Sequence, residues 1–262
     1  MIRPARWTVS PGLVSPEWRW VCRGLVCALP FWETGGDRVS DIVSHQRFWG
    51  LNRAIWTPGA RGGGPRWTTF DEWKLQDCFP SWPKGNAAMS VFFAGHASVG
   101  AKNAVFLIWG ERATRQCHGF SMSSAGRFTY FNWGDDLTGN IIVADEQPVT
   151  LAATYNGARG KRTYVNGVFD VSSTTGADLN ILDNSAGFAP KIGGLQEGTG
   201  WLPWDQPYEV LYVWDWALSD AMIAKLHADP FGPLRIADEV PIVFGGVAPP
   251  GLLTRSFAVI VG

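Results

Sequence analysis

The amino-acid sequence predicts an all-β fold, a two-sheet antiparallel sandwich with one short helix near the C-terminal end. Of the 262 residues, 46% are hydrophobic and 17% are charged, a composition that supports a sizeable core and is unlike that of a disordered chain. Short apolar segments of about five to seven residues recur between turn residues, which is typical of a sandwich or barrel. Convincing helix signals occur in one segment alone.

Three regions are expected along the chain: an N-terminal arm over residues 1–23, a sandwich domain over residues 24–232 and a C-terminal arm over residues 233–262. The first region holds three Pro and three Trp without clear periodicity, so we expect it to be extended. The last region alternates Pro breaks with short β-prone runs, and we expect it to dock as an added strand.

The first strand is expected between Gly24 and Trp32, where Pro30 restricts the segment to a sheet edge or a bulge. Residues 53–67 contain a cluster of Gly and Pro, which predicts a loop. Two segments, Val149 to Tyr155 and Tyr208 to Trp214, are apolar enough to be central strands. The other expected strands are Met89 to Ala94, Ala104 to Trp109, Gly119 to Ser123, Arg127 to Trp133, Arg162 to Val165 and Val168 to Val171.

Two local signals are sharper than the rest. Asn166-Gly167 supplies the two positive φ values of a type I′ turn, so the strands on either side should form a hairpin. Ser219 can cap a helix of about two turns that ends before Asp229-Pro230, with Asp220 in its first turn where the helix dipole favours negative charge.

A family resemblance rests on three motifs in order: the strand Val149 to Tyr155, the hairpin Tyr164-Val-Asn-Gly167, and Ile192-Gly-Gly194 followed by the run from Glu209 to Asp220. On these motifs the chain resembles the laminin-G-like, concanavalin-A-like lectin/glucanase superfamily over roughly residues 24–230. Gly24 to Asp41 is similar to the opening strand and turn of that superfamily. The resemblance implies a jelly-roll sandwich and leaves the chemistry open, because the motifs are structural.

The Pro-rich arm, the laminin-G-like body and the exit His227-Ala-Asp-Pro-Phe231 together are similar to proteins of tailed bacteriophages. This resemblance implies a non-enzymatic virion structural protein, a capsid decoration, fibre-like or tail-associated protein. Its terminal arms would contact other virion proteins or copies of itself. The alternative is a carbohydrate-binding module that attaches to a host-surface glycan.

A glycoside hydrolase is disfavoured, and the chain is predicted not to be an enzyme. Retaining glycosidases need two carboxylates about 5–5.5 Å apart. The strand expected to carry such a pair offers Glu209 and Asp215, which the strand rise places about 20 Å apart. Neither the four His nor the segment Gly119 to Ser123 matches a nucleophile motif.

The 15 Trp residues supply the candidate binding side chains, because Trp is usually buried or placed against a partner. The sugar-stacking candidates are Trp133, Trp201 and Trp204, with core or intersubunit packing as the alternative for the last two. The partner-binding candidates in the N-terminal arm are Trp7, Trp18 and Trp20, with a segment folded back over its own sandwich as the equal alternative. Asp135 and Asp136 are candidate Ca²⁺ ligands, with a solvated turn as the alternative.

Several classes of partner and site are disfavoured. The net charge of -1 offers no basic field for nucleic acid, and no apolar run reaches the roughly 18 residues of a membrane span. The first 20 residues lack the apolar run of a secretory signal, so a soluble or virion-bound protein is expected. The four cysteines, Cys22, Cys27, Cys78 and Cys117, show no zinc-type spacing and are either disulfide-bonded or buried thiols.

Overall fold

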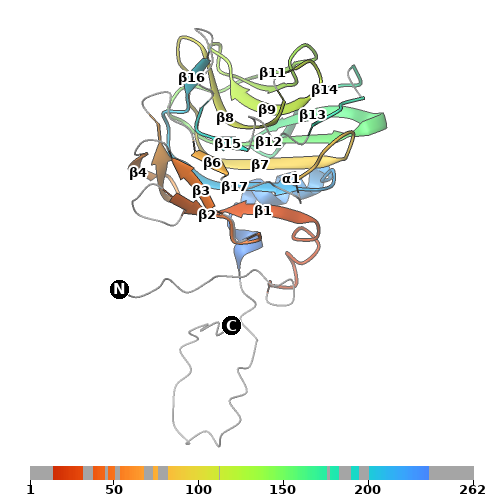
Figure 1. Ribbon diagram of the computed structural model, residues 1–262. Coiled ribbons are helices and arrows are strands. Elements are labelled where there is room, and N and C mark those ends of the chain that lie inside the picture. The colour runs from red at the N-terminus through yellow and green to blue at the C-terminus, as the bar shows by residue number, and fades with distance from the viewer. Residues whose placement is uncertain are drawn as a thin grey trace, which may run out of the picture.

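The computed structural model describes residues 14–31, 38–44, 47–50, 54–67, 73–75, 82–111, 113–175, 178–182, 190–194 and 201–235. These residues form two β-sheets packed face to face, a separate two-stranded hairpin and one α-helix (Figure 1). The predicted all-β sandwich is therefore confirmed.

The six-stranded sheet contains both strands that the sequence places at the centre. Its order is β1 (Leu25–Leu29), β17 (Tyr208–Trp214), β7 (Met89–His96), β12 (Pro148–Asn156), β13 (Gly160–Val165) and β14 (Val168–Ser173). β17 lies between β1 and β7, and β12 lies between β7 and β13. β1 is an edge strand, in agreement with the restriction that Pro30 imposes.

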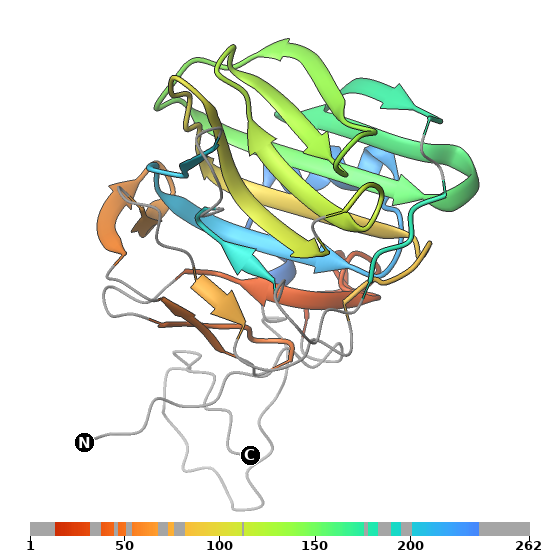
Figure 2. The ribbon, with the colours of Figure 1, turned by 45° about the horizontal axis from the view of Figure 1, so that its top comes forward.

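The nine-stranded sheet covers one face of the six-stranded sheet, and Figure 2 shows β8 to β10 in front of it. Its order is β11 (Leu137–Ile142), β10 (Arg127–Phe131), β9 (Cys117–Met122), β8 (Asn103–Gly110), β15 (Lys191–Ile192), β6 (Trp73–Leu75), β3 (Arg47–Gly50) and β2 (Arg38–Ser40), and β16 (Trp201–Pro203) pairs in parallel with β8. The sequence does not predict the shortest of these strands, because so few residues carry no periodic pattern.

The expectation that residues 53–67 form a loop is wrong. This segment is an antiparallel hairpin of β4 (Ile55–Gly59) and β5 (Gly62–Arg66), separate from the two main sheets. Gly and Pro are tolerated there because the hairpin is a two-stranded ribbon with free edges. Gly64 is required by packing, since an added Cβ would lie 1.4 Å from the carbonyl oxygen of Tyr208 in β17.

The predicted hairpin and helix are both confirmed. Asn166 and Gly167 have φ values of 49° and 75° between β13 and β14, as a type I′ turn requires. The helix α1 (Asp220–Ala228) begins after Ser219, whose Oγ accepts a hydrogen bond from the backbone N–H of Met222 at 3.4 Å. No helix in the described ranges is long and apolar enough to cross a membrane.

The described residues form two main hydrophobic cores. The first lies between the sheets and contains Phe93, Phe106 and Tyr208, whose rings are in contact. The second lies on the outer face of the six-stranded sheet, where α1 and residues 14–22 pack against it. Both faces of β17 and β12 are consequently buried, which explains why these strands are apolar without alternation.

Other predictions concern the cysteines and the two termini. Cys22, Cys27 and Cys117 are free buried thiols, whereas Cys78 lies outside the described residues. Burial raises the pKa of Cys22 to about 12, so this thiol stays protonated at neutral pH.

Residues 1–13 and 236–262 also lie outside the described residues, and so does the strand expected in the C-terminal arm.

Candidate functional site

Three aromatic side chains from distant parts of the sequence meet on the outer face of the nine-stranded sheet. The ring centroids of Phe131 and Trp201 are 4.9 Å apart, those of Phe131 and Trp133 are 5.6 Å apart, and those of the two indoles are 6.2 Å apart. Phe131 is buried, while Trp133 and Trp201 are partly exposed. We call these three residues the aromatic shelf.

Strand geometry directs Phe131 and Trp201 to this face. In β16, Leu202 points into the core, so its neighbour Trp201 points outward. Phe131 ends β10 and pairs with Gly119 of β9. A Cβ added at Gly119 would lie 2.1 Å from the Phe131 ring, so the missing side chain allows the ring to lie flat across the sheet.

Trp133 reaches the shelf from the turn that follows β10. Trp133 and Gly134 both have positive φ, 57° and 121°, and a tryptophan rarely adopts this conformation. The turn is closed by the Asp136 carboxylate, which accepts a hydrogen bond from the backbone N–H of Asn132 at 2.9 Å. The Asn132 carbonyl accepts a second bond from the backbone N–H of Arg115 at 2.7 Å. These contacts hold the backbone against its strain.

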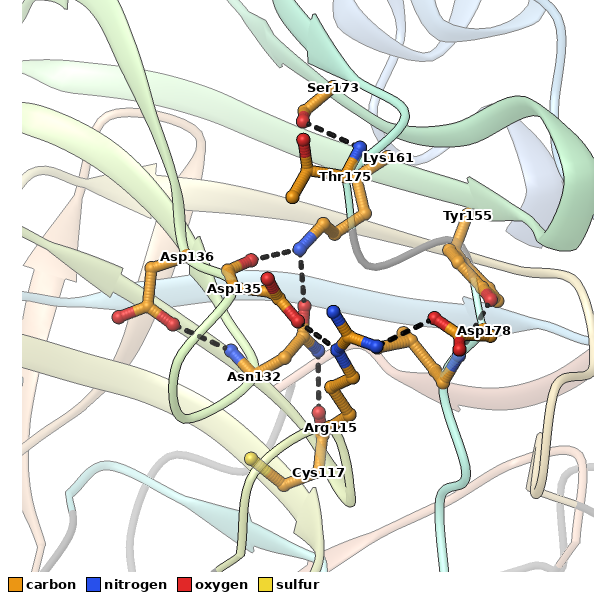
Figure 3. Close-up of polar contacts among 11 residues, drawn as sticks. Arg115, Cys117, Asn132, Asp135, Asp136, Tyr155, Lys161, Ser173, Thr175 and Asp178 are labelled. Carbon is orange, nitrogen blue, oxygen red and sulfur yellow. Dashed lines mark hydrogen bonds and ion pairs between the residues drawn. The ribbon is translucent and has the colours of Figure 1, made fainter.

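A buried polar network lies beneath this turn and joins the two sheets (Figure 3). The Asn132 amide donates to the carbonyl of Cys117 at 2.6 Å, and its Oδ1 accepts from Lys161 Nζ at 3.0 Å. Lys161 belongs to β13 of the six-stranded sheet and also donates to the backbone carbonyl of Asp135. The position of Trp133 therefore depends on a residue of the opposite sheet.

Charged groups at the end of the sandwich complete the network. The Arg115 guanidinium binds the carboxylates of Asp135 and Asp178, the latter at 3.0 Å. Its hydrogen bond lowers the pKa of Asp135 below the ordinary value. Burial lowers the pKa of Lys161, and the nearby charges of Asp135 and Asp136 act in the opposite direction.

The contacts of Asp135 and Asp136 favour the alternative of a turn over the predicted role as Ca²⁺ ligands. Asp135 is bound to Arg115, and Asp136 accepts the backbone N–H of Asn132. The ammonium group of Lys161 also lies close by. Among the residues that the structure describes, no group of three or more His, Cys, Asp or Glu side chains could hold a metal ion. The two carboxylates serve the turn and its neighbouring cations.

His118 and Tyr130 form a buried pair on the inner side of the nine-stranded sheet. His118 Nδ1 lies 2.5 Å from the hydroxyl of Tyr130, and burial lowers the pKa of His118 to about 3. The ring is fully enclosed and packs against Trp109 and Tyr155. This histidine is neutral at ordinary pH and is not in a position to meet a ligand from solution.

The third sugar-stacking candidate, Trp204, is not on the surface. It has no exposed area and packs against Phe93 and Phe106, with both centroid distances 5.2 Å. An indole enclosed in this way cannot face a sugar, so Trp204 is a core residue. The alternative of core packing is correct for Trp204, whereas Trp201 is on the shelf.

Two of the three Trp candidates of the N-terminal arm are described by the structure, and they differ in exposure. Trp18 is only 2% exposed and packs against Gly232, with Lys225 Nζ of α1 4.4 Å from its ring centroid. Trp20 is 42% exposed, with the same Nζ 5.3 Å from its ring. Trp18 is therefore held by its own chain, which corrects its assignment to a partner. Trp7 lies outside the described residues.

Glu209 has a structural role in the described residues. Its carboxylate accepts the backbone N–H of Arg61 at 2.6 Å and forms an ion pair with the Arg61 guanidinium at 2.8 Å. The side chain is buried, and it fastens the tip of the β4–β5 hairpin to β17.

Sequence reasoning missed Phe131, Asn132 and Lys161. The alternation of a strand offered a signal for two of them. Phe131 lies two residues before Trp133, and Lys161 shares its strand face with the buried Thr163 and Val165. Asn132 has no comparable signal, because its role depends on contacts across the sandwich.

Solved structures resemble this chain in fold. A Trypanosoma rangeli sialidase mutant displaying trans-sialidase activity is 12% identical, with a TM-score of 0.58 over 85% of this chain and 36% of the sialidase chain. Domain 4 of AbnA, a GH43 extracellular arabinanase from Geobacillus stearothermophilus, in complex with arabinotriose, is 14% identical, with a TM-score of 0.54 over 78% and 98%. The binding domain of Paraclostridial Mosquitocidal Protein 1 is 14% identical, with a TM-score of 0.57 over 80% and 53%.

These matches show the fold and leave the family open. No protein-family model and no curated protein matches the sequence. The chain spans only 36% of the sialidase chain, so the sialidase is matched over about a third of its length. The comparisons show neither a laminin-G-like nor a bacteriophage family, and what they support is the β-sandwich fold.

The prediction that the chain is not an enzyme is corrected by the same matches. It rested on the separation of Glu209 and Asp215, about 20 Å at the usual strand rise, and on the lack of a nucleophile motif. The fold also occurs within sialidases and within a GH43 arabinanase, so the carboxylates of one strand do not decide whether a chain of this fold is catalytic.

Proposed function

We propose that this chain binds carbohydrate through the aromatic shelf. The observation that carries the proposal is the pair of partly exposed indoles, Trp133 and Trp201, with centroids 6.2 Å apart and planes 35° apart. Aromatic faces are negative and attract the positively polarised C–H groups on the apolar face of a sugar ring. Two indoles at this spacing offer stacking surfaces to one sugar or to two adjacent sugars.

Rigid support of the shelf favours binding. Phe131 lies under both indoles, and the turn of Trp133 is fixed by Asp136 and by the buried Asn132. A site that is already ordered loses less conformational entropy when a ligand binds. A tryptophan with positive φ is also an arrangement that persists only where its surroundings enforce it.

The comparisons supply the first probes. Arabinotriose was bound to the arabinanase domain of which 98% is matched, and sialic acid was bound to a sialidase of which 33% is matched. We expect a neutral oligosaccharide to bind better than sialic acid, because Arg115 is already paired with Asp135 and Asp178.

The test is a titration of the full chain with arabinotriose and with sialic acid, followed by calorimetry and by tryptophan fluorescence. Trp133→Ala and Trp201→Ala should each weaken binding by about tenfold or more, without a matching fall in melting temperature. Trp20→Ala is the matched control, because Trp20 is exposed and contacts Lys225 of α1, away from the shelf. Unchanged affinity in both shelf variants would rule out this site.

The same mixtures should be checked for cleavage of arabinotriose, because the fold occurs in glycoside hydrolases. Binding without release of arabinose identifies a binding module for that sugar. Release of arabinose assigns a hydrolase activity to this chain. The virion role stays a prediction that rests on sequence resemblance.

A further inference from the structure

Lys161 and Asn132 place an amine and a carboxamide together inside the protein. Lys161 is 1% exposed and Asn132 is fully buried. They are 29 residues apart in sequence, Lys161 in β13 of one sheet and Asn132 directly after β10 of the other, yet Nζ lies 3.0 Å from Oδ1 of the amide. Figure 3 shows the two side chains meeting end to end beneath the turn of Asp135 and Asp136. Lys161 supports the turn of Trp133 from below, and its amine also lies against a carboxamide with which it can react.

We propose that Lys161 and Asn132 form an intramolecular isopeptide bond that joins the two sheets covalently. The Lys161 Nζ attacks the Asn132 Cγ, so an Nζ–Cγ bond forms and the Cγ–Nδ2 bond breaks. One proton moves from Nζ to Nδ2, which leaves as ammonia. The reaction consumes no oxidant and no other reactant.

The contacts of Lys161 favour the neutral amine that this reaction needs. The two acceptors that the structure gives Nζ are uncharged, the amide oxygen of Asn132 and the backbone carbonyl of Asp135. Burial lowers the pKa of Lys161. The carboxylate of Asp135 is meanwhile directed to Arg115, so the nearest anion is engaged by another cation.

The contacts of Asn132 fix the orientation of the amide. Its Nδ2 donates to the Cys117 carbonyl at 2.6 Å, while Oδ1 faces the amine. The amide is therefore held with its oxygen on the amine side and its nitrogen, the leaving group, on the Cys117 side. Reactants held at hydrogen-bond distance in a fixed orientation react with an effective concentration far above that in free solution.

Asp136 is the candidate proton carrier, because its carboxylate acts on Lys161 and is not the one that binds Arg115. Its carboxylate accepts the backbone N–H of Asn132 at 2.9 Å, and its charge acts on Lys161. It would accept a proton as Nζ bonds to Cγ and return a proton to Nδ2 as ammonia leaves. The carboxylate is thereby regenerated.

The test is the intact mass of the full chain after denaturation. An isopeptide bond lowers the mass by one ammonia relative to the sequence, and proteolysis should yield one branched peptide that contains both Lys161 and Asn132. The unmodified mass in a protein that unfolds cooperatively would overturn the proposal. This outcome needs no variant, so it does not depend on whether a substitution folds.

Variants distinguish formation of the isopeptide bond from other reactions that release ammonia. Lys161→Met should restore the full sequence mass, whereas Lys191→Met, which removes another buried lysine, should keep the loss. If the loss persisted in Lys161→Met, it would come from cyclisation of an asparagine on its own backbone, and the proposal would fail. Asp136→Asn should slow the linkage, and an unchanged rate would remove Asp136 from the reaction.

Discussion

His118 is a described residue whose ionisation is strongly opposed by the fold. Its ring is enclosed between the sheets, and burial lowers its pKa to about 3 from the ordinary 6.5. The folded protein therefore keeps the ring neutral at a pH at which the unfolded chain takes up a proton. Protons then favour the unfolded state, so the stability that His118 contributes is present above about pH 6.5 and falls as the pH drops towards 3.

We expect the free energy of unfolding to lose about 1.4 kcal/mol per pH unit through this residue across that window. His118→Gln removes the titrating group and keeps a hydrogen-bonding side chain beside Tyr130. Urea unfolding of both proteins at several pH values between these limits measures the slopes. If the slopes were equal, His118 would not be the group that takes up the proton.

The substitution of Gly64 by Ala adds a single methyl group and so tests whether the β4–β5 hairpin packs against β17. A Cβ at this position would lie 1.4 Å from a backbone oxygen of Tyr208, and no rotation of a side chain can relieve that contact. We expect Gly64→Ala to destabilise the fold by about 1–3 kcal/mol. Gly157→Ala is the control, since its nearest atoms are 3.5 Å away. Equal melting temperatures for the two variants would show that the hairpin does not pack here.

At the scale of elements, the edges of the two sheets are joined by one carboxylate. Asp170 of β14 accepts the backbone N–H groups of Asn140 and Ile141 in β11 at 2.9 and 3.1 Å. Asp170→Ala should cost about 1–3 kcal/mol, because two donors lose their acceptor. Asp170→Asn keeps a carbonyl oxygen and should retain most of the stability. Thermal unfolding distinguishes the two variants. If both lost a similar amount of stability, the charge of Asp170, and not its carbonyl oxygen alone, would be what stabilises the fold.

Sequence patterns predict the elements whose signals are local. The apolar runs of β12 and β17, the Asn166-Gly167 turn and the Ser219 cap are each decided within a few residues, and all four agree with the structure. The β4–β5 hairpin is missed because two of its glycines, Gly59 and Gly64, are needed for close contacts with Glu209 and Tyr208 of β17, which is distant in sequence.

The candidate site is predicted only in part for the same reason. Trp133 and Trp201 can be predicted from the sequence, because an aromatic residue in a turn or loop indicates a contact with a partner. Their contact with one another through Phe131 arises from three segments that meet in the fold. Trp204 is only three residues from Trp201 and yet faces the core, a difference that depends on the direction of each side chain and on what covers it.

At the scale of the whole molecule, residues 14–22 belong to the folded body. Val14, Trp18 and Val21 are buried in the second core with α1, and each contributes about 1.5–3 kcal/mol by leaving water. We expect a chain lacking residues 1–23 to melt at a clearly lower temperature than a chain lacking residues 1–13, which keeps all three side chains. Light scattering on the shorter deletion then measures assembly separately from folding. Equal melting temperatures would show that this segment does not stabilise the sandwich.

The pairing of β1 with β17 has a consequence for synthesis on the ribosome. Leu25 lies opposite Trp214, and β17 inserts between β1 and β7. The six-stranded sheet therefore cannot close until translation has passed residue 214. Until then β1 and β7 have no common neighbour, and their apolar faces are open to other chains. Contacts this distant in sequence also slow the closure itself. The six-stranded sheet is therefore expected to complete its folding only after β17 has emerged from the ribosome.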